Sequence, residues 1–367
     1  MQNDHRLSVI VAAGGTGGDL FPVLSVIERL ASIVADRSQF DVTFVGNPDR
    51  IEGRVIPIRG YRFVPIPMRG YYGLRSLRTY SMVWRLPVSV FHVYRAVRRL
   101  RPRVAILAGA YLSIPLGLVA KVSGIPIVLV EINAAPGKVN RLLAPWAHSI
   151  LVSSNQCRTA FPPAVRDRIV VTGTPIRAEV LAGADASEAR QHFGLAPDRP
   201  VLLVLGGSLG ARSINDAIAQ HLDRILATGW QVLWQTGSDY WHPHKDGVVA
   251  LPFIEDMASA YAAATIVISR AGGSTVAELA ALAKPAVLVP YPHAANREQH
   301  RNAALLEQSG GAIAVEDALL ATKLWNILEP LLKDPKQPQQ MATALQRYGQ
   351  SDAADQAART IAALLGQ

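Results

Sequence analysis

Short apolar runs rich in β-branched residues alternate with stretches of helical character along the chain, and this alternation constrains the fold more than any other feature. Each run is followed by loop and helix signals, as is typical of buried strands in a parallel sheet. The runs comprise residues 7–13, 42–46, 104–109, 126–132, 150–154, 200–208, 231–237, 248–253, 266–273 and 285–291. We therefore predict an α/β protein.

The runs form two sets that share one layout. The first strand of each set closes on a glycine-rich turn, at 14–18 and again at 206–210, and the segment between the sets is polar and rich in turn residues. We predict two Rossmann-like domains that face one another across a cleft. The expected divisions of the chain are residues 1–175, 176–340 and a pair of terminal helices within 341–367.

Composition excludes several classes of protein. The 367 residues include one cysteine, Cys157, so neither an internal disulfide nor a cysteine-based zinc site can form, and a reducing compartment is favoured. The apolar run near the N-terminus lacks a cleavage pattern, so we expect no signal peptide. Glycine and proline interrupt the most lipid-like stretch, 104–122, which we predict to be strand, loop and helix and not a membrane span.

Basic charge is concentrated in the first half of the chain. Residues 1–180 contain 23 Lys and Arg against 10 Asp and Glu, and from Arg50 to Arg103 thirteen arginines accompany a single acid, Glu52. Such a surface can meet nucleic acid, anionic lipid or a phosphorylated substrate, or only solvent. No RNP, KH or zinc-finger pattern is present, so we expect no nucleic-acid partner.

Aromatic residues interleave with these arginines, and the stretch contains no lysine. This mixture favours an interfacial membrane patch, in which arginines meet headgroups and rings lie at the boundary. The residues that we assign to this basic patch are Arg75, Arg78, Trp84, Arg85, Arg95, Arg98 and Arg99.

Three glycine-rich turns are candidates for anion binding, because backbone N–H groups at a helix start can approach a phosphate. The turns at 14–18 and 206–210 match neither the dinucleotide fingerprint nor the P-loop, and tight packing of strand against helix explains them equally well. The third turn opens a helix and places Gly273, Ser274 and Thr275 at its N-terminus.

Three side chains could complete a diphosphate-sugar site. Glu278 lies one turn into that helix and could reach a ligand, or it could only complement the helix dipole. Arg177 would supply a cation, and the amide of Gln299 could both donate to and accept from sugar hydroxyls, although a plain helix cap is an alternative. No histidines or carboxylates have metal-ligand spacing, so we expect no metal and no cofactor.

Six motifs together resemble the MurG family, which comprises peptidoglycan N-acetylglucosaminyltransferases of glycosyltransferase family 28 with the GT-B fold. The resemblance covers nearly the whole chain, and "PGKVNRLLAPW" with "GTPIR" resembles its cyanobacterial branch. The motifs are "GGTGGDLFPVLSV", "EINAAPGKVNRL", "GTPIR", "LGGSLGARSIN", "LPFIEDMASAYAAATIVISRAGGSTVAELA" and "VPYPHAANREQHRNA".

This resemblance implies an activity and a place in the cell. The family transfers N-acetylglucosamine, with inversion, from UDP-N-acetylglucosamine to the 4-hydroxyl of undecaprenyl-diphosphate-linked N-acetylmuramoyl-pentapeptide. The reaction converts lipid I to lipid II in cell wall synthesis, at the cytoplasmic face of the plasma membrane. The basic patch falls where the family meets that membrane.

The resemblance also assigns residues by motif. The second domain would hold the donor, with Ile254 at the uracil, Glu278 on the ribose hydroxyls and Gln299 at the sugar. Ser208 and Arg177 would lie at the diphosphate. From the first domain, which takes the lipid-linked acceptor, the residues facing the cleft would be Thr16, Gly17, Gly18 and Asn133.

Three residues differ from the family pattern, each at a position where the family has a polar side chain that we expect in the cleft. Asp19 and Val130 stand where the family has histidine, and Leu209 stands where it has glutamine. An inverting transferase must take a proton from the attacking hydroxyl. We hypothesise that Asp19 is this general base and that Glu131 and Asn133 place the hydroxyl, the alternative being that Asp19 only caps its helix.

These departures leave three further functions open. The chain could be a related transferase with a different lipid or a soluble acceptor. It could be a UDP-sugar epimerase, which needs no acceptor and has little use for an arginine-rich apolar face. It could also bind the donor without turnover, in which case no acceptor would cause release of UDP.

Overall fold

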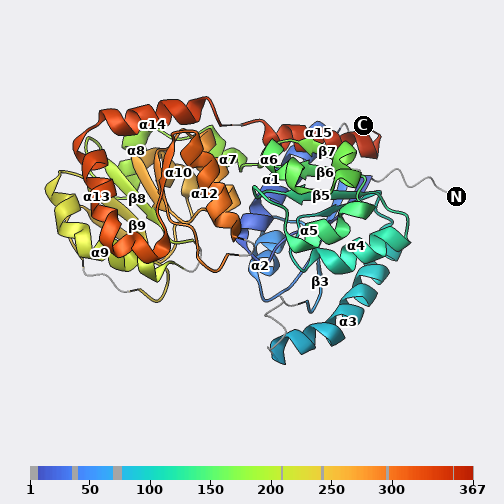
Figure 1. Ribbon diagram of the computed structural model, residues 1–367. Helices are drawn as coiled ribbons and strands as arrows, with labels where there is room; N and C mark the ends of the chain where they lie inside the picture. Colours follow the sequence, from blue (N-terminus) through green and yellow to red (C-terminus); the bar gives the residue numbers. More distant parts are fainter. Residues whose placement is uncertain are drawn as a thin grey trace. The chain divides into compact units, whose positions relative to one another are not determined.

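The computed structural model describes most of the chain, which divides into two compact units. The first unit is Met1–Pro175 with Asp352–Gln367, and the second is Ile176–Ser351 (Figure 1). We call them the first and second units. The described residues are 7–34, 40–68, 77–207, 210–240, 244–294, 297–349 and 351–366, without the side chains of 77–83.

Among the described residues, the first unit contains a parallel sheet of seven strands in the order β3-β2-β1-β4-β5-β6-β7. The strands are β1 (Leu7–Ala12), β2 (Phe40–Gly46), β3 (Arg62–Pro65), β4 (Val104–Leu107), β5 (Ile127–Glu131), β6 (Ser149–Val152) and β7 (Ile169–Val171). The helices are α1 (Gly17–Ile33), α2 (Ile51–Ile58), α3 (Leu77–Leu100), α4 (Ser113–Val122), α5 (Lys138–Leu143), α6 (Asn155–Ala160) and α15 (Ala353–Leu365), with 3-10 turns η2 (Ala144–Trp146) and η3 (Pro163–Arg168).

Strand β1 shows why the apolar runs are continuous. All six of its residues are buried. Successive side chains of a strand point to opposite faces, so Val9 and Val11 enter one hydrophobic core while Ile10 and Ala12 enter the other. Helices cover both faces of the sheet, so five of the six residues of β1 are apolar and Ser8 is its single buried polar residue.

The C-terminal helix α15 belongs to the first unit. Its buried residues Ala357, Ile361 and Leu365 recur at a spacing of four and enter the same core as residues of α1. The Arg29 Nε donates to Asp355 Oδ1 over 2.7 Å and joins the two helices at the surface. The segment 341–367 is therefore shared, because α14 (Lys336–Gln346) lies in the second unit.

Within its described residues, the second unit contains a parallel sheet of six strands in the order β10-β9-β8-β11-β12-β13. The strands are β8 (Val201–Leu205), β9 (Gln231–Gln235), β10 (Val248–Leu251), β11 (Ile266–Ser269), β12 (Ala286–Leu288) and β13 (Ala312–Ala314). The remaining helices are α7 (Ala178–Ala182), α8 (Ala186–His192), α9 (Arg212–Ala227), α10 (Met257–Ala263), α11 (Gly273–Ala281), α12 (Glu298–Gln308), η5 (Asp317–Leu319) and α13 (Leu320–Lys333).

Strand β8 repeats in the second unit the arrangement of β1. Leu202 and Val204 enter one core, whereas Val201, Leu203 and Leu205 enter the other. The predicted fold class, with two parallel α/β sheets, is therefore confirmed. In the part of the chain that the structure describes, no helix has the length and apolar character needed to cross a membrane.

Candidate active site

The first glycine-rich turn closes on a buried carboxylate. The Gly15 N–H donates to Glu52 Oε2 over 2.9 Å, the Asn47 N–H donates to Oε1 over 3.0 Å, and Glu52 is fully buried. Gly14 has φ 152°, and a Cβ there would lie 2.5 Å from the Glu52 Cδ. The glycines thus make room for a negative charge directly behind the turn, which disfavours a phosphate at this position.

Glu52 was not among the predicted site residues. It is the single acid among the thirteen arginines between Arg50 and Arg103, and that isolation was the available signal. Its spacing from the turn, 37 residues from Gly15, gives no local pattern from which the contact could have been predicted.

Asp19 lies in the first turn of α1, directly after this closed loop. Thr16 is the residue before the helix, and its Oγ1 donates to Asp19 Oδ2 over 3.2 Å. Thr16 is exposed, while Gly17, Gly18 and Asp19 are half-buried. The carboxylate therefore lies within the positive end of the helix dipole and remains reachable from solvent.

Glu131 and Asn133 lie at the end of β5. The Glu131 carboxylate accepts from the Asn133 N–H at 3.0 Å and the Asn133 Nδ2 at 3.1 Å through Oε1. Its Oε2 accepts from the Gly137 N–H at 2.8 Å and the Asn140 Nδ2 at 2.9 Å. Burial raises the pKa of Glu131, and these N–H donors oppose that effect. With both oxygens engaged, Glu131 is placed to shape the loop that carries Asn133.

The carboxyl ends of parallel strands meet at one edge of a sheet, and β1 and β5 are separated only by β4. Asp19 and the Asn133 loop therefore lie at the same edge of the first unit. Val130 does not join them, because its side chain is 3% exposed and belongs to the hydrophobic core. The expectation that position 130 presents a changed side chain to the cleft is wrong.

In the second unit, helix α11 begins at the third glycine-rich turn. Gly272 is the residue before the helix, and Gly273, Ser274 and Thr275 form its first turn. Their N–H groups have no partners within the helix, so they provide donors for an anion.

Glu278, in the next turn of α11, joins a buried polar cluster. Arg177 Nη2 donates to Glu278 Oε1 at 3.0 Å, and the Tyr261 hydroxyl donates to Oε2 at 2.9 Å. Burial, reinforced by the Glu278 charge, raises the pKa of the Tyr261 phenol well above its ordinary value, so it remains a donor. The structure thus brings the predicted Arg177 and Glu278 together as an ion pair, and Tyr261 is the member that the sequence analysis missed.

Ile254 is tied to the second glycine-rich turn. Its N–H donates to Gln235 Oε1 at 3.0 Å, and Gln235 Nε2 donates to the Gly207 carbonyl at 2.8 Å. Gln235 was also missed, although it lies in the predicted run 231–237 and ends β9, where polar residues of parallel sheets gather. Ser208 and Leu209 lie outside the described residues.

Gln299 lies in the first turn of α12. Its Oε1 accepts from the Tyr291 N–H at 2.9 Å. Together with the α11 turn, the Arg177–Glu278–Tyr261 cluster and Ile254, this amide belongs to the second unit, as the resemblance implied for the donor site. Within the described residues, no group of three or more His, Cys, Asp or Glu could hold a metal ion.

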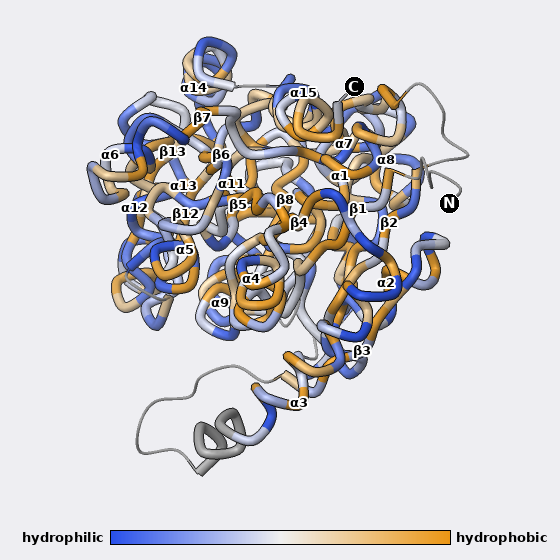
Figure 2. Tube along the Cα trace, turned by 90° about the vertical axis from the view of Figure 1, so that its right-hand side faces the viewer, coloured by the Kyte–Doolittle hydropathy of each residue, from blue (hydrophilic) through white to orange (hydrophobic). Residues whose placement is uncertain are grey.

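The described part of the basic patch lies on α3. Ser89, Val93 and Val97 form its buried face, while Trp84 and Phe91 are 80% and 56% exposed on the other side. Hydrophobic and hydrophilic positions interleave along this helix (Figure 2). Arg75 lies outside the described residues, as does the side chain of Arg78. Arg85 is half-buried, and Arg95, Arg98 and Arg99 are exposed.

Known proteins resemble the chain over its full length. Residues 9–152 match the glycosyltransferase family 28 N-terminal domain, and residues 201–357 match the corresponding C-terminal domain. The UDP-N-acetylglucosamine–N-acetylmuramyl-(pentapeptide) pyrophosphoryl-undecaprenol N-acetylglucosamine transferase of Syntrophotalea carbinolica is 35% identical over 98% of this chain and 100% of the relative. The transferase of the same name from Phocaeicola vulgatus is 33% identical over 98% and 96%.

Among solved structures, MurG of Acinetobacter baumannii superposes with a TM-score of 0.72 at 25% identity, over 97% of this chain and 99% of that one. The two parallel sheets and the α11 site therefore define a glycosyltransferase of the GT-B class. More particularly, the chain belongs to glycosyltransferase family 28. The comparisons do not support the predicted cyanobacterial branch.

Proposed function

We propose that this protein transfers N-acetylglucosamine from UDP-N-acetylglucosamine to the 4-hydroxyl of a lipid-linked N-acetylmuramoyl-pentapeptide, converting lipid I to lipid II. The observation that carries the proposal is the α11 site, with the Arg177–Glu278–Tyr261 cluster beside it, in a chain similar over its full length to transferases with this activity. The second unit takes the donor, and the first takes the acceptor.

The donor site suits a nucleoside diphosphate sugar. The Glu278 carboxylate can accept from ribose hydroxyls, and the Arg177 guanidinium, which donates to Glu278, supplies a positive charge at the site. This positive charge and the N-terminus of α11 can stabilise the charge that develops on the departing UDP. The polar cluster thereby couples recognition of the ribose to stabilisation of the leaving group.

The transfer is a displacement with inversion. The acceptor 4-hydroxyl oxygen forms a bond to C1 of the sugar as the bond from C1 to the UDP oxygen breaks, and the hydroxyl proton passes to a base. Asp19 fits this role because its carboxylate is reachable at the carboxyl edge of the first sheet. Asn133, held in place by Glu131, would orient the hydroxyl.

The decisive test measures UDP release from UDP-N-acetylglucosamine with and without a short-chain lipid I analogue. We expect release that depends on the acceptor, and a fall of about a hundredfold or more in Asp19→Asn. Asp41→Asn, a carboxylate-to-amide change in the surface ion pair with Arg62, is the matched control and should retain full activity. Activity of Asp19→Asn within a few-fold of wild type would rule out Asp19 as the general base and would leave it the role of a helix cap.

The same assay separates the alternatives. Conversion of the donor to another UDP-sugar without acceptor would indicate an epimerase. Binding of UDP without any release of UDP from the donor would indicate a protein that has lost turnover. Release that requires an acceptor other than lipid I would indicate a related transferase.

The exposed face of α3 would place the protein at the cytoplasmic surface of an anionic membrane. Arg95 lies 5.9 Å from the ring centroid of Phe91, so charge and apolar surface occupy one face. We expect sedimentation with anionic vesicles at low salt, reduced several-fold by Trp84→Ser with Phe91→Ser and reduced also by high salt. Ile58→Ser, which removes an 84% exposed apolar side chain from α2, is the control. Failure of the wild type to sediment would refute the contact.

A further inference from the structure

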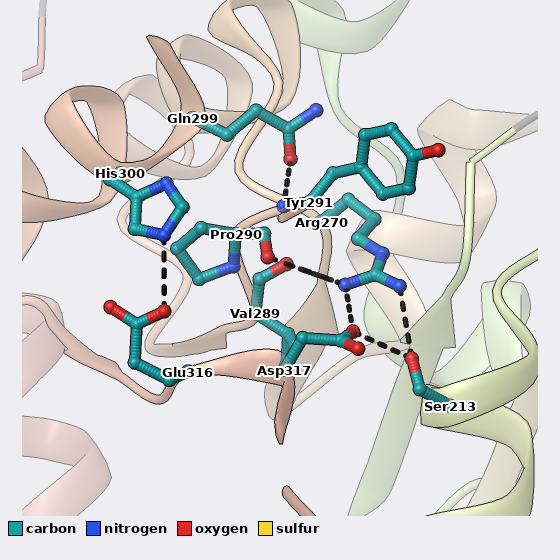
Figure 3. Close-up of polar contacts among 9 residues, drawn as sticks. All are labelled: Ser213, Arg270, Val289, Pro290, Tyr291, Gln299, His300, Glu316 and Asp317. Carbon is teal, nitrogen blue, oxygen red and sulfur yellow. Dashed lines mark hydrogen bonds and ion pairs between the residues drawn. The ribbon is translucent and has the colours of Figure 1, made fainter. Parts of the chain in front are cut away.

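Arg270 lies two residues before Gly272 at the start of α11, and its guanidinium joins three separate segments of the second unit (Figure 3). Nη1 donates to the Val289 carbonyl at 3.2 Å and the Pro290 carbonyl at 3.5 Å, and it forms an ion pair with Asp317. Nη2 donates to Ser213 Oγ at 3.0 Å. The guanidinium thereby fixes the backbone that follows β12.

This network is closed and largely shielded from solvent. Ser213 Oγ donates in turn to Asp317 Oδ1 at 2.6 Å, and the side chains of Arg270 and Asp317 are only 14% and 21% exposed. A planar guanidinium with five donors can satisfy such a set at once, whereas a single ammonium cannot.

The adjacent acid, Glu316, holds the other end of the same segment. Its Oε2 lies 3.0 Å from His300 Nε2, and its Oε1 lies 3.9 Å from Arg297 Nη2. Two consecutive carboxylates therefore secure both ends of the chain between β12 and α12, one through Arg270 and the other through the first turn of α12.

Gln299 receives its orientation from this secured backbone. The Tyr291 N–H, one residue after the carbonyl of Pro290, donates to the Gln299 amide. Since an N–H can donate only to the amide oxygen, the amide nitrogen must point the other way (Figure 3). That nitrogen donates to no other residue in the described part of the chain, so both of its N–H groups are available to a ligand.

We propose that Arg270, with Asp317 and Ser213, is a positioning residue that presets the Gln299 amide to donate to a hydroxyl of the donor sugar. The proposal rests on the proposed function, because it requires that the second unit bind a UDP-sugar. Recognition of the sugar, but not of the nucleotide, then depends on the Arg270 side chain, although Arg270 contacts neither of them.

The test compares the Kd values of UDP and UDP-N-acetylglucosamine, measured by calorimetry. Arg270→Lys should weaken UDP-N-acetylglucosamine about tenfold and UDP less than about twofold, as expected for the loss of one well-oriented hydrogen bond. In a Gln299→Ala background, Arg270→Lys should cause no further loss. Arg199→Lys is the matched control, because Arg199 also donates to two carbonyls, of Gly229 and Trp230, and should leave the ratio of the two Kd values unchanged.

Equal weakening of both ligands by Arg270→Lys would overturn the proposal, and so would losses that add fully to those of Gln299→Ala. If Arg270→Lys does not fold, Ser213→Ala decides, with the same selective pattern expected at about threefold. A wild type that binds UDP while Gln299→Ala leaves sugar binding unchanged would refute the positioning role alone. A wild type that binds neither ligand would refute the proposed function itself.

Discussion

Replacement of Glu131 by glutamine tests whether its carboxylate organises the end of β5. The two oxygens each accept from two N–H groups, so an amide nitrogen must face two donors whichever way it is turned. Rotation of the Asn133 amide can relieve one of these conflicts, but a backbone N–H remains without an acceptor. A buried N–H without an acceptor costs about 1–3 kcal/mol. In the two hydrogen bonds that remain, a neutral amide oxygen replaces a charged carboxylate oxygen as acceptor, which costs about 1 kcal/mol more.

Glu131→Gln should therefore lower the free energy of unfolding of the first unit by about 2–4 kcal/mol. Urea denaturation at pH 8 measures the change. Glu28→Gln is the control: it breaks the surface ion pair with Arg59 and should change stability by less than about 1 kcal/mol. A loss of stability below about 1 kcal/mol for Glu131→Gln would refute the role of Glu131 in organising the loop after β5. It would favour direct contact between Glu131 and the substrate instead.

Two further changes test groups in the second unit. Burial lowers the pKa of Lys284 from 10.5 to about 8, so between these values the unfolded chain binds more protons and the free energy of unfolding should rise with pH. The pKa difference of 2.5 units corresponds to about 3 kcal/mol of free energy of unfolding. Urea denaturation of wild type and Lys284→Met at several pH values should show the rise in stability with pH only in the wild type. Tyr261→Phe removes the hydroxyl donor from Glu278 and should cost about 1.5–3 kcal/mol of stability and weaken UDP binding, measured by denaturation and calorimetry. Unchanged values would show that the hydroxyl does not support the carboxylate.

Much of the fold could be predicted from the sequence because buried parallel strands are continuous apolar runs. The runs at 7–13 and 266–273 contain β1 and β11, and the polar ends of the predicted runs extend beyond the strands into the turns. Three short strands, β3, β7 and β13, were not predicted. They have three or four residues each and lie at or near a sheet edge, so few buried side chains distinguish them from loop.

The candidate site was less predictable, because its partners are distant in sequence. Arg177 and Glu278 are 101 residues apart, and Glu52 and Gly15 are 37 apart. A motif gives the residue types at a helix start, but only the folded sheet shows which carboxylate is exposed to a substrate and which is enclosed by N–H donors.

That distinction bears on the departures from the family pattern. Val130 lies in the core, so its difference from histidine alters packing and not the reactive edge. Of the two departures at described positions, only Asp19 thus reaches that edge. The turn behind it already encloses the carboxylate of Glu52, which disfavours a phosphate at this turn, and our proposal places the diphosphate at α11 and Arg177 of the second unit. A carboxylate at position 19 is then compatible with proton transfer from an uncharged hydroxyl. The dipole of α1 stabilises its negative charge, and no phosphate bound at this turn would repel it.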